Sequence, residues 1–309
     1  MRQLFLLFIV FSQAVIGFTQ SQGPQVPKGY RSMTTLKLAY VFGRIDLIEE
    51  DPSVPDDIAY FRNQTYKIAE QDTLMLDVCF PKNIQEKAPL LVFIYGEDWK
   101  RGNKDKYLGY LINFAKKGYV TSSVWYRTSK KAKFPAAVED VKSAIKWLSG
   151  NSARYHIDTT NIAVIGGSTG GYLALMAAYM SNDKDTTCNI KAVVDLYAPV
   201  DLTNQQVIEE TSAEQFIGKP YSEVPELYQQ ASPINHVSKH VPPTLIFHGT
   251  IDDVVPVDQS KMLENKLKNT GVPVEYHRMK GWPHFMEAGA KVNAYCIYYM
   301  DHFFNKYLK

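Results

Sequence analysis

The sequence predicts one α/β domain built on a mostly parallel sheet, and three observations lead to that prediction. Short apolar runs of strand length alternate with segments of helical periodicity along most of the 309 residues. A glycine-rich turn joins one such strand directly to a helix. The composition, 45% hydrophobic and 21% charged, is that of an ordinary globular protein. Alternation of this kind gives a parallel sheet with helices on both faces.

The first element, residues 1–21, has the layout of a secretory signal peptide. Arg2 precedes an apolar run over residues 4–11, and small or polar residues follow at Gly17, Thr19 and Ser21. The run is short for a membrane span, although an uncleaved anchor is the alternative interpretation. We therefore expect a secreted or periplasmic protein without stable membrane insertion after the signal is removed. The mature chain would comprise residues 22–309.

Residues 22–65 read as an irregular N-terminal extension laid over the domain, because prolines recur there beside an acidic patch. Apolar and other side chains then alternate over residues 74–79, which predicts a strand. The continuous apolar run 89–96 predicts a strand buried on both faces. A helix closing at residues 113–117 leads into another strand over 119–127.

The second half continues the same alternation. Helical spacing of apolar residues over 134–149 is followed by a short strand, 161–167, that ends in glycines. The remaining predicted elements are a helix over 172–180, strands over 190–199, 243–247 and 272–277, and helices over 259–269 and 288–307. Residues 204–232 interrupt this rhythm, so we expect a short cap-like insertion there.

Charge and cysteine content exclude several classes of protein. The formal net charge is +2, and the basic residues do not cluster, so nothing indicates a nucleic-acid partner. Three cysteines, at 79, 188 and 296, are too few for a disulfide framework and match no zinc-binding spacing. We expect Cys79 and Cys296 to be small buried hydrophobic residues, and at least one cysteine to be free or paired between chains.

The candidate chemistry centres on Ser168. Residues 166–170 read Gly-Gly-Ser-Thr-Gly, between a predicted strand and a predicted helix. A serine on such a sharp turn projects its hydroxyl above the edge of the sheet, and the glycines allow the strained backbone. A plain glycine-rich turn or a phosphate-binding loop is the alternative interpretation of this segment taken alone.

Two later loops supply partners for the serine. Asp252 and Asp253 follow one predicted strand, and His284 follows the next. The order Ser168, Asp252, His284 is the nucleophile–acid–base order of a serine hydrolase, and all three lie at carboxyl ends of strands. His284 would take the serine proton, and Asp252 would orient His284, with Asp253 as the competing acid.

Other histidines are weaker candidates. His236 and His240 stand four residues apart, which is compatible with a metal site, but no acidic partner is evident and a solvated loop is the simpler interpretation. His248 reads as part of a strand core. We therefore expect no metal site.

These motifs resemble the α/β-hydrolase superfamily. Within it they are similar to the bacterial feruloyl and acetylxylan esterase group, relatives of the hormone-sensitive-lipase-like carboxylesterases. The resemblance covers roughly residues 66–309 and is carried by residues 76–81, 134–148, 161–174 and 232–256. It implies the α/β-hydrolase fold, a Ser–Asp–His triad with Asp252 as its acid, no cofactor, and hydrolysis of carboxylic esters.

One departure from the family pattern concerns the oxyanion loop. Members usually carry HGGGW or HGGAW after the first buried strand, whereas residues 95–99 here read Tyr-Gly-Glu-Asp-Trp. The backbone N–H groups of Glu97 and Thr169 can still form an oxyanion hole. The carboxylates of Glu97 and Asp98 would disfavour an oxyanion if they pointed inward. Alternatively, they face solvent or select a cationic or polyhydroxy substrate.

The sequence thus predicts a serine esterase that acts on acetyl, feruloyl or other short acyl esters of small molecules or polysaccharides. Because of the altered loop, a catalytically weakened hydrolase acting as a binding protein remains an alternative. A small peptidase or amidase of the prolyl-oligopeptidase-like type is another, since such enzymes share the serine turn and the Asp–His order.

Overall fold

The computed structural model describes residues 23–49, 51–100, 102–180 and 189–309. The predicted signal peptide, residues 1–21, lies outside these ranges. Within them, no helix has both the length and the apolar character needed to cross a membrane.

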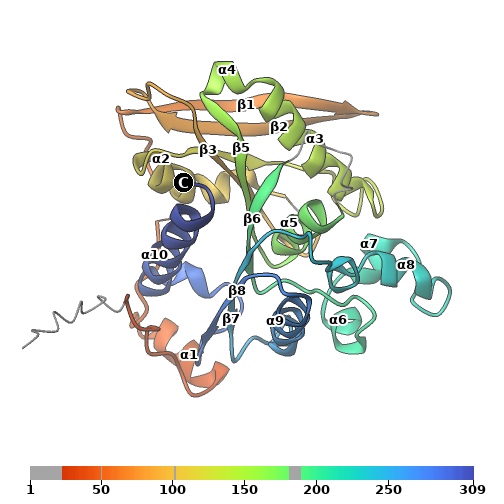
Figure 1. Ribbon diagram of the computed structural model, residues 1–309. Helices are drawn as coiled ribbons and strands as arrows, with labels where there is room; N and C mark the ends of the chain where they lie inside the picture. The colour runs from red at the N-terminus through yellow and green to blue at the C-terminus, as the bar shows by residue number, and fades with distance from the viewer. Residues whose placement is uncertain (1–22, 50, 101, 181–188) are drawn as a thin grey trace, which may run out of the picture.

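An eight-stranded sheet forms the centre of the molecule, with strand order β1-β2-β4-β3-β5-β6-β7-β8 (Figure 1). β1 pairs with β2, and β2 with β4, in the antiparallel sense, whereas all later neighbours are parallel. The strands are β1 (Ile58–Ala69), β2 (Asp72–Pro81), β3 (Ala88–Ile94), β4 (Val120–Val124), β5 (Ile157–Gly167), β6 (Ile190–Leu196), β7 (Thr244–Gly249) and β8 (Val274–Met279). The predicted mostly parallel sheet is therefore correct.

Helices cover both faces of this sheet (Figure 1). Those that pack on the central strands are α2 (Leu108–Lys116), α3 (Ala136–Gly150), α5 (Thr169–Tyr179), α9 (Asp258–Thr270) and α10 (Ala290–Tyr307). The other helices are α1 (Met33–Val41), α4 (Ser152–Tyr155), α6 (Gln205–Glu210), α7 (Ala213–Ile217) and α8 (Pro225–Gln230), with 3₁₀ turns η1 (Lys104–Tyr107), η2 (Pro233–His236) and η3 (Met286–Ala288).

The apolar run of β3 is continuous because both faces of this strand are buried. Its residues alternate between two separate cores: Leu90, Val92 and Ile94 pack with α3, α5 and α9, whereas Leu91 and Phe93 pack with α2 and α10. All five side chains are fully buried. A strand enclosed on both faces has no solvent side, so polar alternation disappears, as the sequence predicts for this segment.

The predicted extension 22–65 is too long at its carboxyl end, because β1 already begins at Ile58. β1 is an edge strand whose register shifts between Phe61 and Gln64 and again between Thr65 and Lys67, and Asn63 has φ 54°. Such bulges interrupt the two-residue periodicity that identifies a strand in a sequence.

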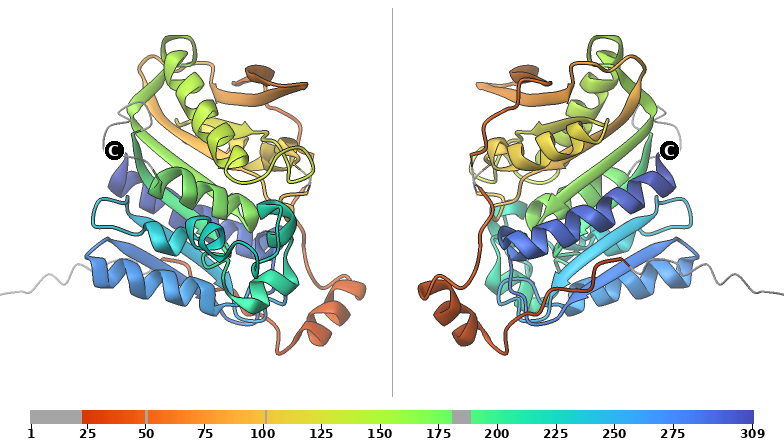
Figure 2. Two further views of the ribbon diagram at one scale, coloured as in Figure 1. Left: turned by 90° about the vertical axis from the view of Figure 1, so that its right-hand side faces the viewer. Right: turned by 90° about the vertical axis from the view of Figure 1, so that its left-hand side faces the viewer.

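The N-terminal segment before β1 crosses the body of the domain, while α1 projects from it (Figure 2). Leu47 forms an isolated bridge with Gly289, and the Ile48 N–H donates to the Ala288 carbonyl at 2.9 Å. These contacts hold the segment against the turn that follows His284.

The interruption predicted at residues 204–232 corresponds to the short helices α6, α7 and α8, which lie together beside the sheet (Figure 1). Cys79 and Cys296 are buried and free, as expected, and burial raises the pKa of the Cys79 thiol to about 12. Cys188 lies outside the described residues.

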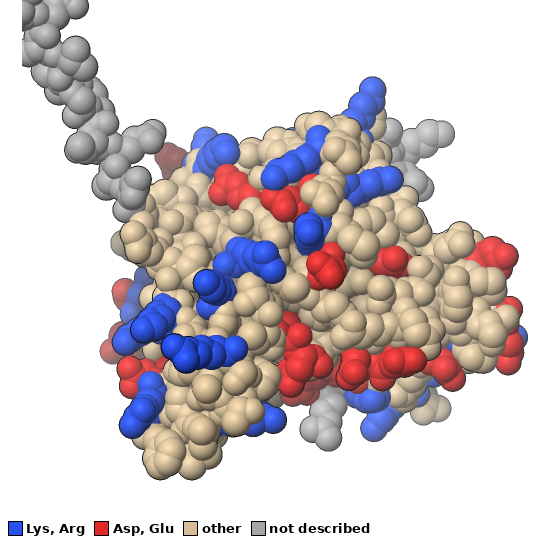
Figure 3. Space-filling model, turned by 90° about the horizontal axis from the view of Figure 1, so that it is seen from below, with Lys and Arg blue, Asp and Glu red and all other residues tan. Residues whose placement is uncertain are grey.

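Charged side chains of both signs occupy the face shown in Figure 3. Lysine and arginine are spread over the left and upper parts of that view with acidic residues between them, and a row of aspartate and glutamate follows its lower edge to the right.

Candidate active site

Ser168 lies on the tight turn between β5 and α5. Its backbone has φ 55° and ψ −126°, a conformation that is strained for a residue with a side chain. The Ser168 N–H donates to the Leu196 carbonyl at 2.8 Å, which ties the turn to the neighbouring strand β6. A Cβ atom on Gly170 would lie 2.0 Å from the Ile94 carbonyl oxygen, so the turn packs against β3 only with glycine there.

Three loops bring the predicted triad residues into one hydrogen-bonded chain. The Ser168 hydroxyl lies 2.9 Å from His284 Nε2, and His284 Nδ1 lies 2.7 Å from Asp252 Oδ2. Ser168 follows β5, Asp252 follows β7, and His284 follows β8. Since β5, β6, β7 and β8 run parallel, their carboxyl ends share one edge of the sheet, and residues 116 positions apart meet there.

The Asp252 carboxylate is held by donors on both of its oxygens. Oδ1 accepts from the N–H groups of Val254 and Val255 at 2.9 and 2.8 Å, while Oδ2 faces His284. Burial alone would raise the pKa of Asp252, but hydrogen bonds from His248 and His284 outweigh it and hold the pKa well below its ordinary value. Asp253 is exposed, so the acid facing His284 is Asp252.

His248 was expected to be only part of a strand core, yet it also contacts the triad acid. Its Nε2 atom lies 3.0 Å from the Val255 carbonyl oxygen and 3.2 Å from Asp252 Oδ2. A carbonyl oxygen only accepts, so Nε2 carries a hydrogen, and Nδ1 is hydrogen-bonded to the Ser260 hydroxyl at 2.7 Å. The sequence signal was its position, four residues before Asp252 at the end of β7.

Ser168 and His284 open into a cavity of about 390 Å³. Glu97, Thr169 and the exposed ring of Phe285 line the same cavity. A small or medium-sized ester fits this volume. The remaining lining is both polar, with Asp98, Lys100 and Thr211, and apolar, with Pro199, Val254 and Val255.

The two candidate oxyanion segments lie side by side. A Cβ atom on Gly96 would lie 2.9 Å from the Thr169 nitrogen and 2.4 Å from the Gly170 nitrogen, so the loop after β3 touches the serine turn directly. The Trp99 N–H also donates to the Thr169 hydroxyl, at 3.4 Å. The backbone amides of Glu97 and Thr169 therefore belong to adjoining segments beside Ser168.

The two carboxylates of this loop have different surroundings. The Asp98 carboxylate accepts from the Ser212 N–H at 2.7 Å and from the Ser212 hydroxyl at 2.5 Å, and it pairs with Lys100 at 3.0 Å. The Glu97 carboxylate accepts from the Tyr95 hydroxyl at 3.1 Å. Both residues line the cavity, but the Asp98 carboxylate is bound by Ser212 and Lys100, whereas the Glu97 carboxylate is bound by Tyr95.

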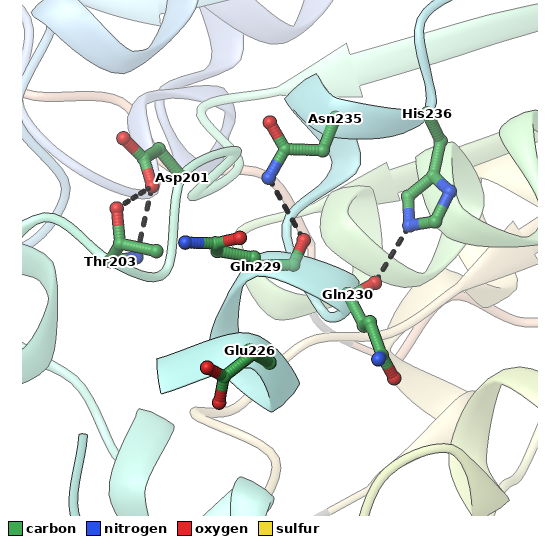
Figure 4. Close-up of a pocket in the computed structure, with 7 residues that line it drawn as sticks. All are labelled: Asp201, Thr203, Glu226, Gln229, Gln230, Asn235 and His236. Atoms are coloured by element: carbon green, nitrogen blue, oxygen red, sulfur yellow. Dashed lines mark hydrogen bonds between the residues drawn. The ribbon is translucent and has the colours of Figure 1, made fainter. Parts of the chain in front are cut away.

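His236 lies away from this site, in a polar pocket of about 610 Å³ with Asp201 and Glu226 (Figure 4). Its Nε2 atom is 2.7 Å from the Gln230 carbonyl oxygen and must donate, so that nitrogen has no lone pair for a metal. His240 is exposed. Among the described residues, no group of three His, Cys, Asp or Glu side chains is arranged to hold a metal ion.

The chain is similar in sequence to known esterases. Esterase LipC of Mycobacterium tuberculosis is 29% identical over 225 residues, which cover 68% of this chain and 56% of LipC. Esterase LipQ of the same organism is 30% identical over 221 residues, covering 67% and 52%. The chain thus spans little more than half the length of these two relatives.

Solved structures show the same architecture. A truncated form of a carbohydrate esterase from gut microbiota superposes with a TM-score of 0.70 at 28% identity, covering 84% of this chain and 98% of that one. Esterase 2 of Thermogutta terrifontis with bound butyrate, at 24% identity and a TM-score of 0.68, covers 79% and 93% and supports the fold alone. The predicted α/β-hydrolase fold is therefore confirmed. Since the BD-FAE family model matches residues 76–267, more than half of the chain, the protein belongs to the BD-FAE family.

Proposed function

We propose that this protein is a serine esterase whose nucleophile is Ser168. The observation that carries the proposal is the continuous hydrogen-bonded chain from Ser168 through His284 to Asp252, at the wall of a cavity of about 390 Å³. A serine hydroxyl becomes nucleophilic when an imidazole accepts its proton, and a carboxylate fixes the imidazole tautomer.

In the proposed reaction, the Ser168 oxygen attacks the ester carbonyl while His284 Nε2 takes the serine proton. The tetrahedral oxyanion is stabilised by the backbone N–H groups of Glu97 and Thr169. His284 then protonates the departing alcohol, which leaves an acyl group on Ser168. Water, activated by His284, hydrolyses this acyl-enzyme and regenerates the free serine.

The substrates that we propose are short acyl esters, acetyl and feruloyl esters among them, of small molecules or polysaccharides. The cavity volume supports an acyl group of that size, and the similarity to a carbohydrate esterase supports a sugar-linked alcohol. A panel of esters with one aryl alcohol and acyl groups of increasing length, assayed on residues 22–309, tests this. A monotonic rise in kcat/KM with long acyl chains would contradict it.

A fluorophosphonate probe separates the esterase from a binding protein built on the same fold. Covalent labelling at Ser168, absent in Ser168→Ala, is the expected result, because the probe reacts only with an activated serine. Unlabelled but folded wild-type protein would support the binding-protein alternative. Rates on matched acetyl esters and acetyl anilides then distinguish an esterase from an amidase or peptidase.

We further propose that residues 1–21 direct export, so that the mature protein is secreted or periplasmic. The support is the arrangement of Arg2, the apolar run and the small residues that follow it. Amino-terminal sequencing of the protein recovered from culture medium or periplasm is the test. A mature chain that still begins at Met1 would contradict removal of the segment.

A further inference from the structure

The loop after β3 has an unusual backbone for residues with side chains. Asp98 and Trp99 adopt φ values of 56° and 54°, so two consecutive non-glycine residues occupy the left-handed region. The family pattern described above has glycine or alanine at position 98 and keeps tryptophan at position 99, and of these only glycine adopts a positive φ without strain. Here the conformation is held by contacts of the side chains instead.

Asp98 makes the first of these contacts, with the residue that precedes α7. Its two carboxylate oxygens accept from the N–H and the hydroxyl of Ser212, at 2.7 and 2.5 Å. Ser212 is buried and makes no side-chain cap of its own helix, since its hydroxyl donates to Asp98. Residues 114 positions apart are thereby joined by two charge-assisted hydrogen bonds.

Trp99 makes the second contact with the same helix. It is fully buried, and its ring stacks on Phe216 of α7 with centroids 4.6 Å apart and planes 10° apart. The backbone N–H of Trp99 donates to the Thr169 hydroxyl at 3.4 Å, so Trp99 connects α7 with the residue whose backbone amide is the second oxyanion donor. The two residues that follow Glu97, Asp98 and Trp99, are therefore both held by α7 and its preceding residue.

We propose that Asp98 is a positioning residue, which acts through Ser212 to fix the loop so that the Glu97 N–H faces the oxyanion. The insertion 204–232 then serves as a support for this loop through α7. This inference rests on the proposed function. An aspartate suits the role because it accepts both Ser212 bonds while its charge is balanced by Lys100. Asp98 and Lys100 both line the cavity, and their opposite charges lie 3.0 Å apart there.

The test compares Asp98→Ala, Asp98→Asn and Ser212→Ala with wild type on a neutral aryl acetate, with rates expressed per serine titrated by fluorophosphonate. We expect kcat to fall about tenfold or more in Asp98→Ala with KM changed less than threefold, because oxyanion donors act in the transition state. Ser212→Ala should fall in the same direction, the double variant little further, and Asp98→Asn should retain more activity than Asp98→Ala.

The control is Asp158→Ala, which removes an aspartate that likewise accepts hydrogen bonds from a backbone N–H and a neighbouring hydroxyl, together with a third bond. The Asp158 carboxylate accepts from the Thr160 N–H at 2.9 Å, the Thr160 hydroxyl at 2.7 Å and the Asn161 side-chain amide at 2.8 Å, within β5 and away from Ser168. We expect this variant to keep the wild-type kcat. If Asp98→Ala lowers thermal stability no more than the control but lowers kcat, the effect is one of positioning.

A second readout uses an aryl boronic acid, which forms a tetrahedral anion on an activated serine. Its affinity should fall in parallel with kcat in Asp98→Ala and Ser212→Ala. Unchanged kcat and boronic-acid affinity in both variants, with active wild type, would overturn the inference and leave the proposed function intact. Wild type that neither hydrolyses esters nor labels at Ser168 would instead overturn the proposed function, and the inference with it.

Discussion

Replacing Asp252 with asparagine is the sharpest test of the triad, because the change keeps the shape of the side chain. Oδ1 of Asp252 accepts from two backbone N–H groups, those of Val254 and Val255. An asparagine must keep its carbonyl oxygen at that position, since the reverse orientation would set its NH₂ group against both donors. The NH₂ group therefore occupies the Oδ2 position, where it faces His284 Nδ1.

That placement forces His284 into the wrong tautomer. With a donor opposite Nδ1, the ring carries its hydrogen on Nε2, which then cannot accept the proton of Ser168. A triad with a misplaced tautomer loses activity by about 10⁴, or about 5.5 kcal/mol in the activation free energy. We expect a loss of that order in kcat on a short-chain aryl ester, with KM little changed.

The matched control is Asp253→Asn, which removes the neighbouring carboxylate from an exposed side chain. We expect less than a threefold change in kcat for this variant. Circular dichroism and titration of the reactive serine establish that both proteins are folded. If Asp252→Asn retained more than a tenth of wild-type kcat, or if Asp253→Asn lost as much, the assignment of the orienting acid would be wrong.

Four other predictions concern the same site. Ser168→Ala should lower kcat by about three orders of magnitude or more, His284→Ala should lower it nearly as much, and the double variant should lose little more. Substantial residual activity in Ser168→Ala would exclude this nucleophile. Glu97→Gln should raise kcat on a neutral ester by up to about tenfold, which corresponds to roughly 1.4 kcal/mol in the activation free energy, and should reduce the salt dependence of kcat. An unchanged kcat at all salt concentrations would show that this carboxylate does not oppose the oxyanion. His248→Leu should lower kcat about tenfold or more, since a hydrogen bond to a charged group contributes about 1.5–3 kcal/mol, and full activity in a folded variant would contradict a role in holding Asp252. The pKa of Asp252 in the folded protein lies below its ordinary value of 3.8, so the ionised carboxylate stabilises the fold above that pH and this stabilisation is lost as the pH falls below it. The free energy of unfolding should therefore fall less steeply with pH below about pH 4 in Asp252→Asn than in wild type. Equal slopes in the two proteins would contradict this.

The sequence alone predicted the features that arise from local patterns. Continuous apolar runs identified β3 and β5, because strands covered on both faces have no polar side. The glycines around Ser168 identified the turn, since a backbone packed this closely tolerates no side chain at Gly166 or Gly170. The order of Ser168, Asp252 and His284 predicted their meeting because parallel strands end at one edge of the sheet.

Contacts between distant segments were decided only by the tertiary structure. β1 escaped prediction because it is a bulged edge strand, whose periodicity is broken at Asn63. The contact of His248 with Asp252 depends on how the loop after β7 folds back on itself. The two carboxylates that looked equivalent in the sequence, Glu97 and Asp98, differ because Ser212, 114 residues away from Asp98, binds only one of them. Local sequence determines backbone conformation and burial pattern, whereas the partner of a charged side chain depends on which distant element the fold places beside it.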